Sequence, residues 1–255
     1  MLPPLQYAIV GFHKAMIDLD RISQQKLETD PYRWAVIDEL FSPPDAEALA
    51  ATFPHDHFKR LSHYGGDKDS EYEARALVSM GEHRISRPET LSTAWQALAN
   101  DFLTPAYRAA LSSLTGINLG DAVLEVNVFH YPPGGLLGAH PDLIDKIVTQ
   151  VLYFNRSWND EDGGCLTILR SSDPGDIAMT VSPLIGNSAV LVRSDDSWHA
   201  VSPVVKSCRR SRRSLTATFY QPGSVSTMWP PGDTTPLHNY KPGWRQRLAD
   251  WAQRR

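Results

Sequence analysis

A histidine and an aspartate stand two residues apart at positions 140 and 142, within the stretch GAHPDLIDK. On an extended segment, residues i and i+2 point to the same side, so His140 and Asp142 can direct both side chains at one metal ion. The pair alone is weak evidence, because both residue types are common in turns. A metal site here needs a third ligand from elsewhere in the chain.

His199 is the candidate third ligand, because it follows the apolar stretch SAVLV, which is predicted to be a strand. Two histidines and one carboxylate form the facial triad that binds non-haem iron(II) and leaves coordination positions open. The sequence HDHFKRLSH at 55–63 also offers histidines, but it lies in a predicted polar loop, where solvated histidines are expected. We therefore predict a metal site formed by His140, Asp142 and His199.

An oxygenase with such a triad that used 2-oxoglutarate would also need an anchor for the distal carboxylate of that cosubstrate, and the planar fork of arginine suits a carboxylate. The stretch CRRSRRSLTATFY is predicted to be the final strand and supplies several arginines. If Arg212 and Ser214 face the interior, Leu215 and Phe219 face outward and can be buried under helices. This alternation favours Arg212 as the anchor and keeps Arg213 open as the alternative.

The elements that would position these residues change in character along the chain. Residues 120–222 contain short β-rich segments separated by turn sequences such as PPGG and DEDGG, a pattern typical of an antiparallel sandwich or barrel. Residues 1–119 are predicted to form a helical region that packs on this core, with a strand at 34–41, helices at 42–53 and 89–114, and a long loop or lid at 58–87. Residues 223–255 form a Pro- and Trp-rich tail with a predicted helix from Trp244 onward, and this tail offers a surface for a homodimer.

Composition limits the class of protein. The 255 residues carry a net charge of −4, which argues against a protein held mainly to nucleic acid or to an anionic membrane. Two cysteines, Cys165 and Cys208, make no disulfide framework, and no apolar run is long enough to cross a bilayer. We therefore expect a single cytoplasmic domain that binds neither nucleic acid nor a membrane.

Several motifs in order resemble the 2-oxoglutarate- and iron(II)-dependent dioxygenases, and within them the prolyl-4-hydroxylase-like branch. They are HYPPGG before the H-x-D pair, LYFNRSWNDEDGG, WHAVSPV and RRSLT, and together they span about residues 120–222. Ordered motifs are far more specific than any one of them alone. The resemblance implies a mainly β fold with flanking helices around a double-stranded β-helix core of the jelly-roll or cupin type, and Fe(II), 2-oxoglutarate and O2 as cofactors.

The resemblance also implies roles for individual residues. His140, Asp142 and His199 would bind iron, and Arg212 would bind 2-oxoglutarate. The other residues that it places in the 2-oxoglutarate pocket are Tyr153, Tyr131, Asn127 and Ser214. The chain departs from the family where Thr218 replaces a frequent aromatic residue, and the long spacing between His199 and Arg212 keeps Arg213 open as the anchor.

The reaction implied is hydroxylation of an unactivated C–H bond, with release of succinate and CO2. A carboxylate at Asp142 favours hydroxylation, desaturation or cyclisation over halogenation, because related halogenases have a small residue there. The expected substrate is an amino acid or an amino-acid-derived natural product, and the alternative is a prolyl-type residue of a partner polypeptide. The candidate substrate-binding residues are Arg75, Arg84, Arg193 and Trp158, although an ion pair is an equal alternative for Arg193.

Overall fold

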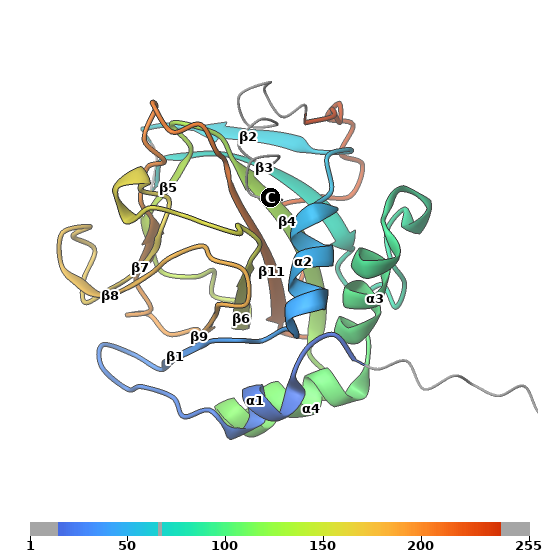
Figure 1. The fold of residues 1–255 in the computed structure, drawn as a ribbon. Helices are drawn as coiled ribbons and strands as arrows, with labels where there is room; N and C mark the ends of the chain where they lie inside the picture. Colours follow the sequence, from blue (N-terminus) through green and yellow to red (C-terminus); the bar gives the residue numbers. More distant parts are fainter. Residues whose placement is uncertain (1–14, 66–67, 241–255) are drawn as a thin grey trace, which may run out of the picture.

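The computed structural model describes residues 15–65 and 68–240, which form a curled antiparallel sheet with helices on one side (Figure 1). In chain order the helices and strands are α1 (Leu19–Gln24), β1 (Trp34–Ile37), α2 (Pro43–Ala51), β2 (Lys59–His63), β3 (Ser70–Val78), η1 (Pro88–Thr90), α3 (Thr93–Phe102), α4 (Pro105–Thr115), β4 (Val123–Tyr131), β5 (Leu136–His140), β6 (Lys146–Tyr153), η2 (Asp160–Asp162), β7 (Leu166–Leu169), β8 (Ile177–Val181), β9 (Ser188–Val192), β10 (His199–Val201) and β11 (Arg212–Tyr220).

The sheet follows the order β1-β9-β6-β11-β4-β3-β5-β10-β7-β8, and β2 pairs with β3 as a branch. All the pairings between named strands are antiparallel, so the long strands β4, β6 and β11 lie side by side while β5, β7, β8 and β10 form the opposite wall. Two facing walls that almost close on each other are the double-stranded β-helix predicted from the sequence. The mainly β fold class is therefore confirmed.

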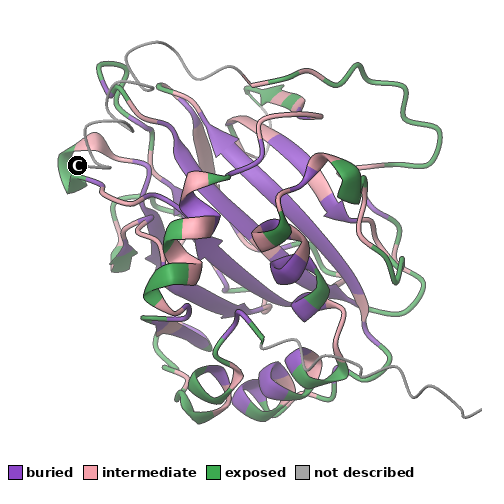
Figure 2. Ribbon diagram, turned by 45° about the vertical axis from the view of Figure 1, so that its right-hand side comes forward, coloured by how far each residue is buried: buried purple, intermediate pink, exposed green. Residues whose placement is uncertain are grey.

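Helices α2, α3 and α4 cover the outer face of the long strands (Figure 1). The main hydrophobic core lies between the two layers, where Trp95 and Phe102 of α3 and Tyr107 of α4 pack with Leu215 and Phe219 of β11. Figure 2 shows the long central strands mostly buried and the helices exposed on their outer side. A strand presents alternate side chains to its two faces, so the outward-facing side chains of β11 are buried only because the helices cover them.

Local sequence explains where the helices begin and end. Ser42 caps α2 by accepting a hydrogen bond from the backbone N–H of Asp45, and two prolines occupy the first turn, where no N–H partner is needed. Thr104 caps α4 in the same way, and Gly116 ends it with φ of 67°, a left-handed conformation that glycine adopts without strain. The predicted break near Pro105 is the boundary between α3 and α4.

Two expectations for residues 1–119 need correction. The segment 58–87 is not one long loop, because nearly half of it forms β2 and β3, and β3 pairs with both β4 and β5. The strand predicted at 34–41 ends at Ile37, and it extends the sheet by pairing with β9. The helix predicted from Trp244 lies outside the described residues. None of the described helices has the length and apolar character needed to cross a membrane.

Candidate active site

The three predicted metal ligands come together at one end of the core. His140 is the last residue of β5, Asp142 follows it in the next loop, and His199 opens β10, which pairs directly with β5 so that His199 lies opposite His140. One ligand atom from each lies within 4.8 Å of the others, and all three side chains are buried. Among the described residues no other group of histidine, cysteine and carboxylate side chains is arranged in this way.

Hydrogen bonds to the backbone fix which ring nitrogen each histidine offers. His140 Nδ1 lies 2.9 Å from the carbonyl of Gly138, and His199 Nδ1 lies 2.8 Å from the carbonyl of Ser197. A carbonyl only accepts, so Nδ1 carries the proton in both rings, and Nε2 of the neutral ring keeps a lone pair. Burial lowers the pKa of both histidines, which favours this neutral, ligating form.

Asp142 is held as a carboxylate by its neighbours. Its Oδ1 accepts a hydrogen bond from Lys146 Nζ at 2.6 Å, and its Oδ2 accepts one from Thr149 Oγ1 at 3.1 Å. Burial alone would raise the pKa of Asp142, but the Lys146 ammonium and His199 outweigh it and hold that pKa well below its usual range. The sequence analysis missed Lys146 and Thr149, whose only signal was their position four and seven residues after Asp142.

A cavity of about 320 Å³ extends from the triad into the space between the two walls. Its lining includes alternate residues of β11, namely Arg212, Ser214, Thr216, Thr218 and Tyr220. Leu215, Ala217 and Phe219 lie in the main core on the other face, which is the alternation predicted from the sequence. Arg213 also faces outward, with its guanidinium 5.3 Å from the ring centre of Phe53.

Arg212 has the surroundings expected of an anion-binding group. It is 2% exposed, its Nη1 donates to Ser214 Oγ at 2.6 Å, and its guanidinium lies 4.6 Å from the ring centre of Tyr131 and 5.3 Å from that of Tyr153. Its Nε and the Tyr153 hydroxyl are buried without a hydrogen-bond partner. Burial raises the pKa of Tyr153, so its hydroxyl remains a donor.

The Pro- and Trp-rich tail contributes a roof to the cavity. We define the roof as residues 226–229, of which Thr227 and Met228 line the cavity. Trp229 Nε1 donates to Asn127 Oδ1 at 2.8 Å, and Ser226 Oγ donates to a Glu125 carboxylate oxygen at 2.5 Å. The predicted pocket residue Asn127 therefore lines the cavity and also ties the roof to β4.

The four candidate substrate-binding residues lie elsewhere. Arg75 is 1% exposed and bonds to Thr90, while Arg84 is exposed and pairs with Glu82. Arg193 pairs with Asp195 at 2.6 Å, which is the ion pair considered from the sequence. Trp158 is buried, with its Nε1 donating to the carbonyl of Gly163 at 2.7 Å. None of the four belongs to the described residues that line the cavity, so their role as substrate contacts stays a prediction.

The chemistry of these donors fits iron(II) and 2-oxoglutarate. The neutral Nε2 atoms of two histidines and one carboxylate are ligands that non-haem iron takes, and they leave coordination positions open. The unpartnered buried donors on Arg212 and Tyr153 match a carboxylate, which only accepts hydrogen bonds. Burying such donors unpaired costs free energy, which a bound dicarboxylate would offset.

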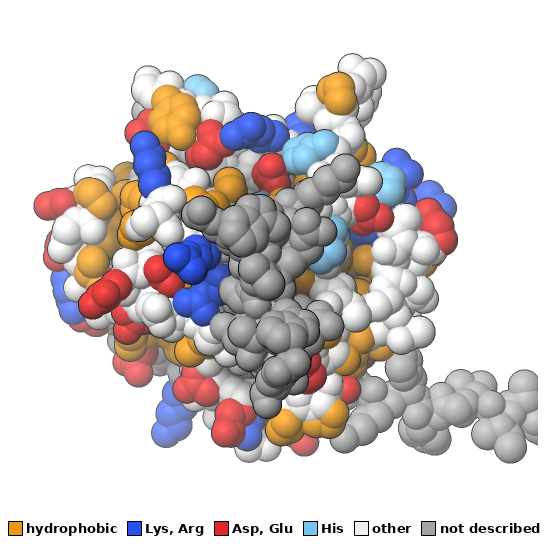
Figure 3. Space-filling model, turned by 45° about the horizontal axis from the view of Figure 1, so that its top comes forward, with side chains coloured by type: hydrophobic (Ala, Val, Ile, Leu, Met, Phe, Trp, Pro, Cys, Tyr) orange, Lys and Arg blue, Asp and Glu red, His pale blue; other side chains and the backbone are white. Residues whose placement is uncertain are grey.

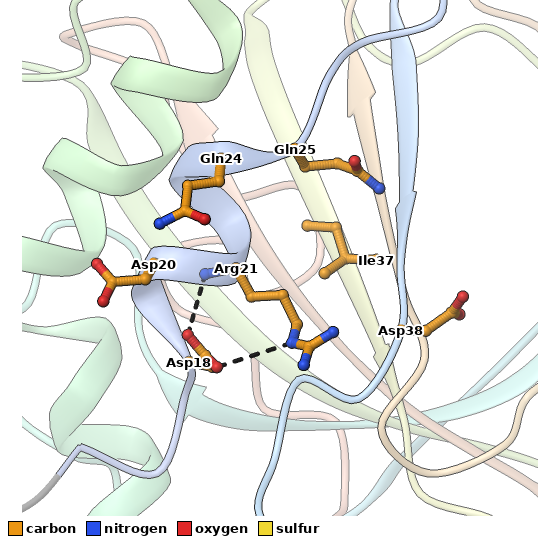
Figure 4. A pocket seen from close by; sticks show the side chains of 7 residues that line it. All are labelled: Asp18, Asp20, Arg21, Gln24, Gln25, Ile37 and Asp38. Carbon is orange, nitrogen blue, oxygen red and sulfur yellow. Dashed lines mark hydrogen bonds and ion pairs between the residues drawn. The ribbon is translucent and has the colours of Figure 1, made fainter.

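A second hollow lies beside α1 and β1 and has different chemistry (Figure 4). Its volume is about 490 Å³, and its polar lining residues are Asp18, Asp20, Arg21, Gln24, Gln25 and Asp38. The Arg21 side chain is paired with Asp18 and Glu39, and the lining contains no histidine or cysteine. The hollow shares no lining residue with the triad cavity, so it contributes nothing to the candidate active site.

The face turned forward in Figure 3 carries basic and acidic side chains interspersed over the part that is described. Arg60 with Glu71, and Lys59 with Asp233, are ion pairs of the β2–β3 hairpin and its neighbours. A nucleic-acid surface would gather lysine and arginine on one face or along one element. The paired charges on this face do not have that character.

Comparisons with known proteins agree with the geometry. Residues 126–220 match the sequence model of the 2OG-Fe(II) oxygenase superfamily, a range that contains all three ligands and Arg212. No curated protein matches the chain. Among solved structures, the chain is similar to a Pseudomonas putida prolyl-4-hydroxylase, with a TM-score of 0.51, 21% identity, and coverage of 80% of this chain and 96% of that one.

Two further solved structures share the fold. A Trichoplax adhaerens prolyl hydroxylase, in complex with a peptide fragment of hypoxia inducible factor, has a TM-score of 0.51 and 16% identity over 80% of this chain and 89% of that one. The α-ketoglutarate-dependent epimerase SnoN from nogalamycin biosynthesis has a TM-score of 0.50 and 14% identity over 88% of this chain and 94% of that one. Their substrates belong to different classes, so the shared fold leaves the substrate of this chain open.

Proposed function

We propose that this enzyme hydroxylates a small molecule, most readily an amino acid or an amino-acid-derived natural product. Its residues 126–220 place it among the iron(II)- and 2-oxoglutarate-dependent dioxygenases of the 2OG-Fe(II) oxygenase superfamily. Iron(II), 2-oxoglutarate and O2 are its cofactors and supply the oxidation of a C–H bond, with succinate and CO2 as products. The observation that carries the substrate class is the small, roofed cavity.

The protein side chains have separable tasks in this proposal. His140, Asp142 and His199 would hold iron on one face. Arg212 lines the cavity and would bind the distal carboxylate of 2-oxoglutarate, with Tyr153 as a second donor, since Tyr153 lies against the Arg212 guanidinium and both carry an unpaired buried donor. The carbonyls that fix each histidine tautomer keep the ligand set in its binding form before metal arrives.

The cavity size and the roof support a compact substrate. A volume of about 320 Å³ is at the lower end of the range for ligand pockets, and 2-oxoglutarate must share it with the reacting group. The roof is tied to the β4 wall by Ser226 and Trp229, and Lys59 of β2 donates to the Met228 carbonyl at 2.9 Å. These ties restrict the open groove that an extended polypeptide would need.

A prolyl-type protein hydroxylase is the second candidate, and one surface observation favours it. Leu143 is 42% exposed and Ile144 is 76% exposed, directly after the metal ligand Asp142. Neighbouring exposed apolar side chains beside an active site can mark where a polypeptide rests. Two of the similar structures are prolyl hydroxylases, one of them with a peptide.

Product analysis separates the two candidates. The purified enzyme with iron(II), 2-oxoglutarate and O2 is incubated with free amino acids or with proline-containing peptides, and succinate and the substrate mass are followed. We expect substrate-dependent succinate and the gain of one oxygen atom with free amino acids. Asp142→Ala is the inactive control. Turnover restricted to peptides would reject the small-molecule proposal in favour of the second candidate.

A further inference from the structure

Two lysines line the catalytic cavity on the side of the metal ligands. Lys146 begins β6 and bonds to Asp142, whereas Lys68 immediately precedes β3. Within the part of the chain that the structure describes, Lys68 forms no hydrogen bond or ion pair. Its charge acts on the site through space, because it lowers the pKa of both His140 and His199.

An ammonium at this place is costly unless something binds it. Burial lowers the pKa of Lys68 to about 8, the nearby Lys146 ammonium adds to that effect, and the Asp142 carboxylate opposes it only in part. Burying a charge without a partner costs free energy, and a neighbouring like charge increases the cost. A half-buried, unpaired lysine that faces the reaction cavity therefore indicates a ligand with negative charge.

The balance of charge in the cavity gives the size of that negative charge. The charged residues among the described lining are three cations, Lys68, Lys146 and Arg212, and two carboxylates, Glu125 and Asp142. Iron(II) and the 2-oxoglutarate dianion cancel each other, so one formal positive charge is left over in the loaded cavity. A substrate with one carboxylate and no ammonium would neutralise it in full, and the α-carboxylate of a zwitterionic amino acid would pair with it locally while the amino group keeps the total at one positive charge.

Lys146 and Arg212 lie at opposite ends of the cavity, and Lys68 is close enough to Lys146 and Asp142 for their charges to act on it. Arg212 is the first residue of β11, and Lys146 lies beside Tyr220, the last residue of the same strand. The metal ligand Asp142 is close to the lysine end through its bonds to Lys146 and Thr149. The distal carboxylate of 2-oxoglutarate at Arg212 is therefore out of reach of Lys68, and the 2-oxo acid end would be held by iron.

We propose that the substrate carries a carboxylate and that Lys68, assisted by Lys146, binds it on the side of the metal away from Arg212. This inference rests on the proposed small-molecule function and deepens it: a free amino acid would be recognised by its α-carboxylate. The inference assigns substrate binding to Lys68 and Lys146, neither of which belongs to a motif recognised in the sequence. They replace the arginines at 75, 84 and 193 as the proposed substrate contacts.

The test compares acids with their neutral amides. Anaerobic protein loaded with iron(II) and 2-oxoglutarate is titrated with L-proline, L-leucine and pentanoate and with the corresponding carboxamides, by calorimetry and by the visible charge-transfer band. The band shows that both cofactors stay bound. We expect the acids to bind at least about tenfold more tightly than the amides, the effect of one charge-assisted hydrogen bond. Equal binding of acids and amides, or no binding of any acid, overturns the inference.

Variants assign the effect to a residue. Lys68→Met should weaken acid binding by about tenfold to a hundredfold and leave amide and 2-oxoglutarate binding unchanged, and Lys68→Arg should restore acid binding. Lys206→Met is the matched control, because Lys206 is exposed and outside the cavity lining. Lys146→Met should weaken acids too, and an iron titration measures its separate effect through Asp142. Unchanged acid binding in Lys68→Met refutes the assignment.

The two proposals fail in different ways. If succinate forms only with peptides while pentanoate still binds through Lys68, the small-molecule function is rejected and the carboxylate site remains. If amino acids are turned over but Lys68→Met binds them as the unmodified protein does, the function stands and the carboxylate site is rejected.

Discussion

Arg212 and Arg213 are adjacent in sequence but face opposite sides of β11, and exchanging each for methionine tests the assignment of the 2-oxoglutarate anchor. Arg212 lines the cavity between Tyr131 and Tyr153, whereas Arg213 lies over Phe53 on the outer face. Methionine keeps much of the side-chain length and removes the charge and the hydrogen-bond donors. The two variants therefore make the same chemical change on the two faces of one strand.

The expected magnitude follows from the burial of Arg212, which is 2% exposed. Truncating one partner of a buried, hydrogen-bonded charge pair costs about 2–5 kcal/mol. At 1.36 kcal/mol per tenfold change, that corresponds to a 2-oxoglutarate dissociation constant raised by about 30-fold to several thousandfold. Arg213→Met should lower the unfolding temperature through its lost packing and change 2-oxoglutarate binding by no more than about twofold.

An anaerobic titration of iron(II)-loaded protein with 2-oxoglutarate, followed by the visible charge-transfer band, measures both constants directly. Iron affinity, determined separately for each variant, is the control that shows the triad is intact. A large loss of 2-oxoglutarate affinity in Arg213→Met with none in Arg212→Met would refute the assigned facing of β11. The absence of any band in the unmodified protein would refute the cofactor site itself.

Three further predictions concern the surroundings of the site. Thr149→Val removes a hydrogen bond to Asp142 with little change in shape and should weaken iron binding by about tenfold to a hundredfold, measured by metal titration. Trp229→Phe removes one tie of the roof and should raise succinate formation without substrate, while an unaltered rate would show that the roof does not gate the cavity. Burial raises the pKa of Glu73, but hydrogen bonds with two histidines outweigh it and leave it below the reference value of 4.5. A pKa that is lower in the folded state than in the unfolded state stabilises the protein fully above pH 4.5, and this stabilisation is lost as the pH falls further. The difference in unfolding temperature between the unmodified protein and Glu73→Gln should therefore shrink below pH 4.5. A difference that grew there would contradict this prediction.

Strand periodicity made much of the core predictable. The segments from 122 to 220 that were expected to be strands became β4, β6, β7, β8, β9 and β11 within a few residues, because their apolar residues alternate and turn residues separate them. The segment 58–87 was misassigned because β2 and β3 have polar, partly exposed faces. Their strand character comes from hydrogen bonding to β4 and β5, which no local pattern indicates.

Lys146 illustrates a limit of periodicity inside the site. Val151 and Thr149 of β6 line the cavity, and counting back by two more residues points Ile147 into it. The pairing of β6 with β11 shifts between Phe219 and Tyr220, so Lys146 lines the cavity instead and Ile147 packs against the main core. A shift of one residue exchanges the two faces of a strand, and only the pairing partner determines where it occurs.

The sequence by itself determined the ligand types, the fold class and the facing of Arg212, because each depends on residue chemistry or on a period of two within one strand. The tertiary structure alone decided which charges surround the ligands. Lys68 lines the cavity although it lies far from the ligands in sequence, and the roof residue Trp229 bonds to the lining residue Asn127. The arginines favoured from sequence lie outside the lining. Long-range packing sets those distances, and the electrostatic selectivity of the site depends on distance.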